Sequence, residues 1–146
     1  MNSIGFYIPQ IDDSDLNVEI FEALNEVVER GEIEDAVVFF DDVQKNTVWP
    51  KFAMMDGAEV WKFKGTLVST SLGVCNSARN AVNTFKLFHL YNREEKNLLQ
   101  LLSVSEDTMF ITRSDEDAEE LHRLTGLGPA VQSDTVAGMI KELEEL

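Results

Sequence analysis

Residues 35–40, DAVVFF, decide the fold of this chain, because a continuous run of β-branched and aromatic residues is typical of a strand buried on both faces. Strands of this kind belong to parallel sheets whose two sides are covered by helices. The preceding segment has the spacing of an amphipathic helix that begins at Ser14 or Asp15 and ends at Gly31. Its apolar side is formed by Leu16, Ile20, Leu24, and Val27 or Val28.

The same alternation of strands and helices continues on both sides of this unit. Strands are predicted at residues 3–8, 52–55, 66–69, 84–91, 109–112 and 130–132, the first ending before Pro9. Helices are predicted as a single turn at 58–63 and as longer elements at 74–80, 94–102, 115–124 and from Val136 onward. Residues 1–146 are therefore expected to form one Rossmann-like α/β domain, with a doubly wound, mostly parallel sheet and helices on both faces.

Composition and charge limit the partners that are expected. A hydrophobic fraction of 44% over 146 residues is enough to fill one core. The formal net charge of −15 is uneven, with −10 in residues 1–50, +3 in residues 51–104 and −8 in residues 105–146. Duplex DNA and anionic membranes are not expected as main ligands, because phosphate binding needs a basic face.

The chain is expected to be cytoplasmic. Its N-terminal residues lack the basic region and cleavage site of a signal peptide, and no apolar run is long enough to span a bilayer. Cys75 is the only cysteine, which excludes an internal disulfide and a cysteine-based zinc site and agrees with a reducing compartment.

Ligands of such folds bind outside the carboxyl ends of the strands, so the turns that follow the strands form the candidate site. The turn after residues 66–69 carries hydroxyls and free backbone N–H groups that suit a phosphate or a carboxylate. Arg113 suits an anionic ligand and, equally, an ion pair with its acidic neighbours. The candidate ligand-binding residues are Ser69, Thr70, Ser71, Gly73, Asn76, Asn92, Arg113 and Ser114.

Some of these residues also have a structural explanation. A serine or threonine before residue 74 can cap the following helix, and Gly73 can permit close backbone packing. Ser114 with Asp117 resembles a capping box in which Asp replaces the usual Glu or Gln.

The sequence contains no complete catalytic, metal or cofactor motif. It lacks the Gly-Lys-Ser/Thr of a Walker loop, a GxGxxG after a strand, and the GxSxG of a nucleophile elbow. His89 is expected to pack against a helix or at a sheet edge, and His122 to be a solvated surface residue. Asp41, Asp42 and Asp56 are carboxylates at turns that suit a divalent cation, although acidic turns are common in so acidic a chain. No cofactor, metal site or catalytic residue is therefore predicted.

Four segments resemble the second half of the N-terminal Rossmann-like domain of GT-B glycosyltransferases, over about half of the chain. They are residues 65–76 (GTLVSTSLGVCN), 86–92 (KLFHLYN), 109–117 (MFITRSDED) and 125–132 (TGLGPAVQ). In that family a strand often ends in a TRS- or TNS-like turn before an acidic helix. The resemblance implies an acceptor-binding half, whereas the family's nucleotide-sugar site lies mainly on a second domain that this sequence lacks. An enzyme would then need another chain, or a second copy, to be complete.

Two hypotheses about function follow. The first is a glycosyltransferase-like domain that binds a polar or anionic ligand, such as a sugar or a nucleotide, or a partner chain, and is not a complete enzyme alone. The second is an acidic interaction protein, of regulatory or viral type, whose Rossmann-like body presents carboxylates to a basic partner. Its binding residues would be Asp12, Asp13, Asp15, Glu116, Glu119 and Glu120. Self-association is compatible with both hypotheses.

Overall fold

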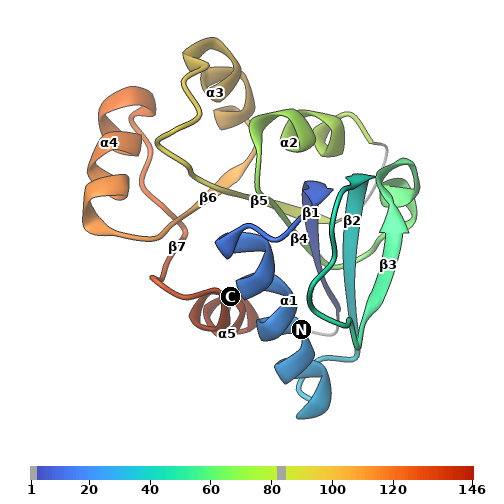
Figure 1. Ribbon diagram of the computed structural model, residues 1–146. Coiled ribbons are helices and arrows are strands. Elements are labelled where there is room, and N and C mark those ends of the chain that lie inside the picture. Colours follow the sequence, from blue (N-terminus) through green and yellow to red (C-terminus); the bar gives the residue numbers. More distant parts are fainter. Residues whose placement is uncertain (1–2, 82–84) are drawn as a thin grey trace.

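A computed structural model describes residues 3–81 and 85–146. Within these residues seven strands form one sheet in the order β3-β2-β1-β4-β5-β6-β7, and every neighbouring pair is parallel (Figure 1). The strands are β1 (Ser3–Ile11), β2 (Asp35–Val43), β3 (Ala53–Asp56), β4 (Thr66–Ser69), β5 (Lys86–Leu90), β6 (Met109–Thr112) and β7 (Val131–Gln132). The predicted Rossmann-like, doubly wound sheet is confirmed.

Helices cover both sides of the sheet (Figure 1). They are α1 (Asp15–Glu29), the 3₁₀ helix η1 (Gly57–Lys62), α2 (Leu72–Arg79), α3 (Leu98–Ser105), α4 (Asp115–Thr125) and α5 (Val136–Glu144). We call the side covered by α1 and α5 the α1 face, and the side covered by η1, α2, α3 and α4 the α2 face. None of the helices in the described ranges has the length and apolar character needed to cross a membrane.

The two faces arise from the alternation of side chains along each strand. In β1, Ile4, Phe6 and Ile8 enter the core of the α1 face, whereas Tyr7 joins the apolar cluster of the α2 face. In β5, Phe88 lies on the α1 face and the next residue, His89, on the α2 face. The order of the strands reverses between β1 and β4, and ligands of doubly wound sheets bind beside this point.

Two strands are longer than predicted. β1 continues through Pro9 to Ile11, although proline lacks an N–H group for the sheet. Pro9 is exposed and lies beyond Tyr7, the last residue of β1 that is in register with β4, so the missing N–H costs no ladder bond on that side. β2 accordingly continues beside β1 as far as Val43.

The prediction of a helix over residues 94–102 is wrong at its start. Residues 94–97 are not helical, and α3 begins at Leu98, where the Asn97 side chain accepts a hydrogen bond from the Gln100 N–H. The predicted strand 84–91 is found at Lys86–Leu90, and Thr84 lies outside the described residues. The displaced start of α3 leaves a non-helical segment with a turn at Arg93 and Glu94 after β5, at the carboxyl edge of the sheet.

Candidate functional site

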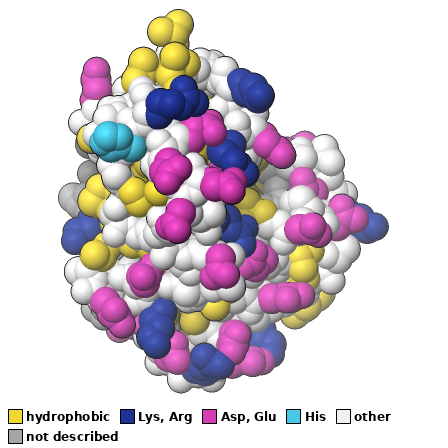
Figure 2. Space-filling model, turned by 90° about the vertical axis from the view of Figure 1, so that its left-hand side faces the viewer, with side chains coloured by type: hydrophobic (Ala, Val, Ile, Leu, Met, Phe, Trp, Pro, Cys, Tyr) yellow, Lys and Arg dark blue, Asp and Glu magenta, His cyan; other side chains and the backbone are white. Residues whose placement is uncertain are grey.

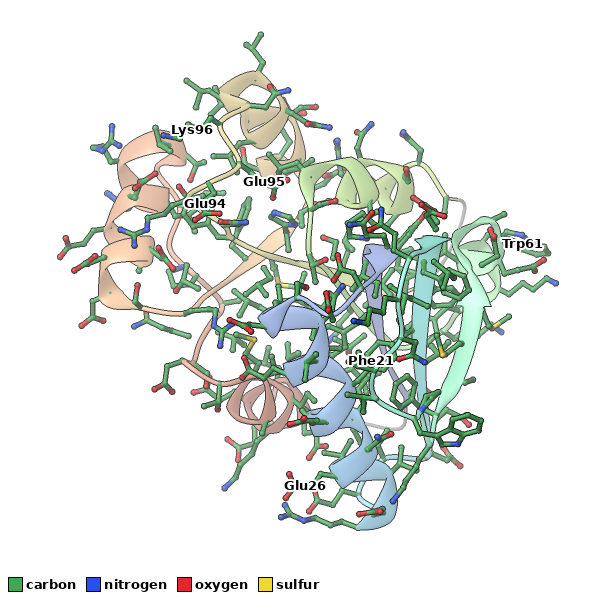
Figure 3. The ribbon with its side chains drawn as sticks, viewed as in Figure 1. Phe21, Glu26, Trp61, Glu94, Glu95 and Lys96 are labelled. Carbon is green, nitrogen blue, oxygen red and sulfur yellow. The ribbon has the colours of Figure 1, made fainter. Side chains whose placement is uncertain are left out.

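A cavity of about 310 Å³ opens where β4, β5 and β6 end, and we call it the strand-end cavity. It lies at the carboxyl edge of the sheet, as predicted for a ligand site in this fold. The segment after β5 forms one wall, and Figure 3 shows Glu94 and Glu95 of this segment between α4 and α2. The lining residues are Leu16, Thr70, Leu90, Tyr91, Asn92, Arg93, Glu94, Arg113 and Asp117.

Arg113 links three elements at one side of the cavity. Its Nη2 donates to Glu19 Oε1 of α1 at 2.8 Å and to the backbone carbonyl of Asp134 at 2.7 Å. The other oxygen of Glu19 accepts the first N–H of α5, from Val136, at 2.8 Å. Arg113 therefore forms an ion pair, as one of its two predicted roles required, but its partner is Glu19 of α1 and not one of its acidic neighbours in the sequence. Among the described residues no partner occupies its Nε or Nη1, so these donors remain available to a ligand.

Arg93 also lines the cavity and was not among the predicted site residues. Its Nε lies 2.8 Å from Asp117 Oδ1 and its Nη1 lies 3.2 Å from Glu116 Oε2, both on α4. Its place directly after Asn92 at a strand end was the available signal. With Glu94 and Asp117, the two arginines give the lining two positive and two negative side chains, so its charge is balanced.

Three of the predicted site residues line the cavity, namely Thr70, Asn92 and Arg113. The other five lie elsewhere because they perform local structural roles. Ser71 caps α2 by accepting from the Val74 N–H, and Ser114 caps α4 by accepting from the Asp117 N–H. Ser69 is fully buried beneath the cavity edge. Gly73 and Asn76 lie within α2, where Asn76 accepts a hydrogen bond from Arg79.

The turn between β1 and α1, which holds phosphates in dinucleotide-binding folds, is acidic in this chain. Asp12 accepts hydrogen bonds from the Ser14 N–H and from the side-chain amides of Gln10 and Asn17. Partial burial alone would raise the pKa of Asp12, but these hydrogen bonds outweigh burial and lower the pKa below its ordinary value. A carboxylate therefore occupies the turn and repels a phosphate there.

A polar cluster surrounds the buried ring of His89 on the α2 face, and we call it the His89 cluster. It contains His89, Ser69, Cys75 and Glu95. Ser69 and His89 are in register on β4 and β5, and Ser69 Oγ lies 2.8 Å from His89 Nδ1. His89 Nε2 lies 3.6 Å from Glu95 Oε1, which is an ion-pair distance and too long for a hydrogen bond. The His89 side chain is only 1% exposed.

The His89 cluster favours the protonated imidazole ring. Burial alone lowers the pKa of His89, but hydrogen bonding with Cys75 and the negative charge of Glu95 outweigh it, so the pKa lies above the ordinary value of 6.5. His89 was expected to pack against a helix or at a sheet edge, and its ring lies on the α2 face beside Cys75 of α2. The sequence did not reveal its polar partners. Glu95 was predicted to lie within a helix, whereas it lies before the start of α3.

Asp41, Asp42 and Asp56 do not form a metal site. Asp41 accepts the Tyr7 hydroxyl at 2.6 Å, and Asp56 caps η1 through the Ala58 N–H. Gly57 is required beside them, because a Cβ at this position would collide with the Tyr7 and Asp41 side chains. Within residues 3–81 and 85–146, no group of three or more His, Cys, Asp and Glu side chains is arranged to hold a metal ion.

The strand-end cavity therefore combines polar groups with an apolar part of the wall. Asn92, Thr70 and the free N–H groups of Arg113 can hydrogen-bond a ligand, while Leu16 and Leu90 provide apolar contact. Six of the nine lining residues are polar or charged, so the cavity suits a polar ligand and is less apolar than a typical small-molecule pocket. Comparisons of the chain with protein-family models, with curated proteins and with solved structures find no match.

Proposed function

We propose that this chain is a ligand-binding Rossmann-like domain that holds a small polar molecule, of the sugar or nucleoside class, in the strand-end cavity. The observation that carries the proposal is the meeting of Thr70, Asn92, Arg93 and Arg113 in one cavity at the carboxyl edge of the sheet. These groups come from three different strand ends, and both arginines keep N–H groups that no described residue occupies.

The charge of the cavity favours a ligand with many hydroxyl groups over a polyphosphate. Arg93 and Arg113 are each paired with carboxylates, so a phosphate would have to compete with Asp117 or Glu19. A hydroxyl group can accept from a guanidinium and donate to a carboxylate at the same time. The acidic turn at Asp12 is also unsuited to the diphosphate of a dinucleotide.

We also propose that the chain is related to the acceptor-binding half of GT-B glycosyltransferases. The support is the resemblance of the four segments described above. No acid, base or nucleophile lines the cavity in an arrangement that suggests group transfer. Ser69 and His89 are buried and are not among its lining residues. We therefore propose binding without catalysis for the chain alone.

Thermal unfolding with a ligand panel tests this function, because a ligand that binds the folded state raises the unfolding temperature by mass action. The panel contains hexoses, uridine, uridine monophosphate, a nucleotide sugar and inorganic phosphate, each at about 10 mM. We expect a shift with a sugar or nucleoside and none with phosphate alone. Arg113→Gln should abolish the shift, while Arg30→Gln, which removes an ion-paired arginine at the far end of α1, should retain it. No shift with any compound would contradict the proposal.

The alternative of an acidic interaction surface has less support. Acidic side chains are numerous on the face seen in Figure 2, but Lys and Arg side chains lie among them. Glu116 in particular is paired with Arg93. A basic partner would therefore meet a surface of mixed charge, and strong electrostatic capture requires a surface of one sign.

A further inference from the structure

We propose that His89 and Glu95 are positioning residues that hold the wall of the strand-end cavity in place, and that this hold depends on a proton carried by His89. The inference rests on the proposed function in one respect, since it treats the wall formed by residues 91–94 as part of the ligand site. The contacts by which His89 and Glu95 hold this wall can be tested in the protein without a ligand.

The attachment is made by the two oxygens of one carboxylate. Glu95 Oε2 accepts the Leu72 N–H, the first of α2, at 2.8 Å, and Glu95 Oε1 faces His89 Nε2. Glu95 follows directly on residues 91–94, and its own backbone N–H donates to the Asn92 carbonyl at 3.1 Å. Glu95 therefore joins the wall to α2 and to β5, and its label lies between α2 and α3 in Figure 3.

The proton matters because Glu95 Oε1 is buried and has no hydrogen-bond partner among the described residues. The Ser69 hydroxyl donates to the Phe88 carbonyl at 3.4 Å, which leaves Ser69 Oγ to accept from His89 Nδ1. In a neutral ring with its hydrogen on Nδ1, Nε2 would present a lone pair to the carboxylate. Protonation places an N–H there and provides a charge-assisted bond to the unpartnered oxygen.

The groups around His89 show that Glu95 is its charged partner. β4 contributes Ser69, α2 contributes Cys75, β6 contributes the ring of Phe110 at 6.0 Å, and the segment after β5 contributes Glu95. Arg79, the basic residue of α2, is engaged with Asp107 instead. A neutral ring at higher pH therefore leaves Glu95 without its counter-charge, and the wall is expected to loosen.

Hydrogen exchange of the Leu72 amide tests the attachment in the ligand-free protein, because Glu95 is its acceptor. We expect the protection factor, corrected for the intrinsic rate, to fall about three- to tenfold as the pH rises from about 6 to about 8.5. The fall should follow the titration of His89 observed by NMR. It should be absent in Glu95→Gln and in His89→Gln, and unchanged in His122→Gln, which removes the exposed histidine of α4.

The outcomes separate this inference from the proposed function. Protection that does not change with pH in the unmodified chain, or a neutral His89 with its hydrogen on Nε2 by ¹⁵N NMR, would overturn it. A pH-dependent fall that disappears in Cys75→Ala would also overturn it, since the thiol would then be the responsible group. If the fall is present and no compound of the panel binds, the attachment is supported and the proposed function fails. Should His89→Gln not fold, the unmodified chain and Glu95→Gln still decide the question.

Discussion

The two faces of the sheet are built from different kinds of residue. Beneath α1 and α5, side chains such as Phe6, Val68 and Phe88 form one continuous apolar core. Beneath η1, α2, α3 and α4, the apolar residues form two clusters, and the His89 cluster lies on the same face. Buried polar groups are retained at a cost unless they are fully paired. The difference suggests that the α1 face provides stability, whereas the α2 face also supports the site at the strand ends.

Phe88→Ala should have the largest effect on stability, because this fully buried ring lies on the apolar α1 face. We expect a loss of about 3–5 kcal/mol in the free energy of unfolding, from lost burial and an unfilled cavity. The loss should be equal at about pH 6 and about pH 8.5, since the described residues that form this core cluster are apolar. Urea unfolding at both pH values measures it, with Phe88→Leu as the milder control. A loss that varies with pH would show that the two faces are not independent.

The difference between the faces also explains what the sequence could predict. The run at residues 35–40 and the amphipathic helix before it predicted the sheet, because apolar periodicity depends on burial alone. That Thr70, Asn92 and Arg113 lie together at one edge of the sheet could be predicted, because the topology specifies the edge at which strand-end residues meet; their binding of a ligand stays a prediction. The contact between Glu95 and His89 could not be predicted from the sequence, because a single contact between a loop residue and a strand residue leaves no periodic pattern. The sequence allowed Arg113 to bind a ligand or to form an ion pair, and it could not decide between these roles because the partner, Glu19, is distant in sequence.

Tyr7→Phe removes a polar contact of the α2 face without changing its shape. The Tyr7 hydroxyl donates to Asp41 at 2.6 Å, and burial together with this carboxylate raises the pKa of Tyr7 well above its ordinary value. We expect a loss of about 1 kcal/mol at neutral pH, because Asp41 itself is exposed. A raised pKa gives stability that is present below about pH 10 and is lost as the pH rises further.

The difference in the free energy of unfolding between Tyr7→Phe and the unmodified chain is measured by unfolding at alkaline pH, with circular dichroism as the signal. Tyr7→Phe should be less stable than the unmodified chain at neutral pH, and the gap should narrow above about pH 10. A constant gap across this range would mean that the Tyr7 hydroxyl is not held neutral by Asp41. Tyr91→Phe provides a matched comparison on the same face, since Tyr91 donates to Glu120 at 2.8 Å.

Asp12→Asn is the corresponding change at the end of the α1 face, and its pH dependence has the opposite sign. The lowered pKa of Asp12 gives stability that is present above its ordinary value of 3.8 and is lost as the pH falls below it. We expect the variant to lose up to about 1 kcal/mol at neutral pH and to match the unmodified chain in strong acid. Asp13→Asn, at an exposed neighbour in the same turn, is the control. Equal acid sensitivity of all three proteins would contradict the role of the Asp12 hydrogen bonds.

Leu99→Ala should have the smallest effect on the free energy of unfolding, and it tests where the α2 face ends. Leu99 of α3 is 81% exposed, whereas Leu101 of the same helix is 3% exposed and packs in the cluster with Leu72 and Tyr91. Hydrophobic side chains protrude at the top of Figure 2, which is the level of α3 in Figure 1. We expect Leu99→Ala to change the free energy of unfolding by less than about 0.5 kcal/mol, against about 2–5 kcal/mol for Leu101→Ala.

The comparison of these two leucines is informative because both substitutions remove the same atoms from one helix. A large loss in Leu99→Ala, measured by urea unfolding of dilute protein, would mean that its side chain is covered in solution. A loss that grows with protein concentration would identify the cover as a second copy of the chain, since association stabilises by mass action. A loss of less than about 0.5 kcal/mol at every concentration would instead place the outer side of α3 in solvent, and the α2 face would then end at Leu101.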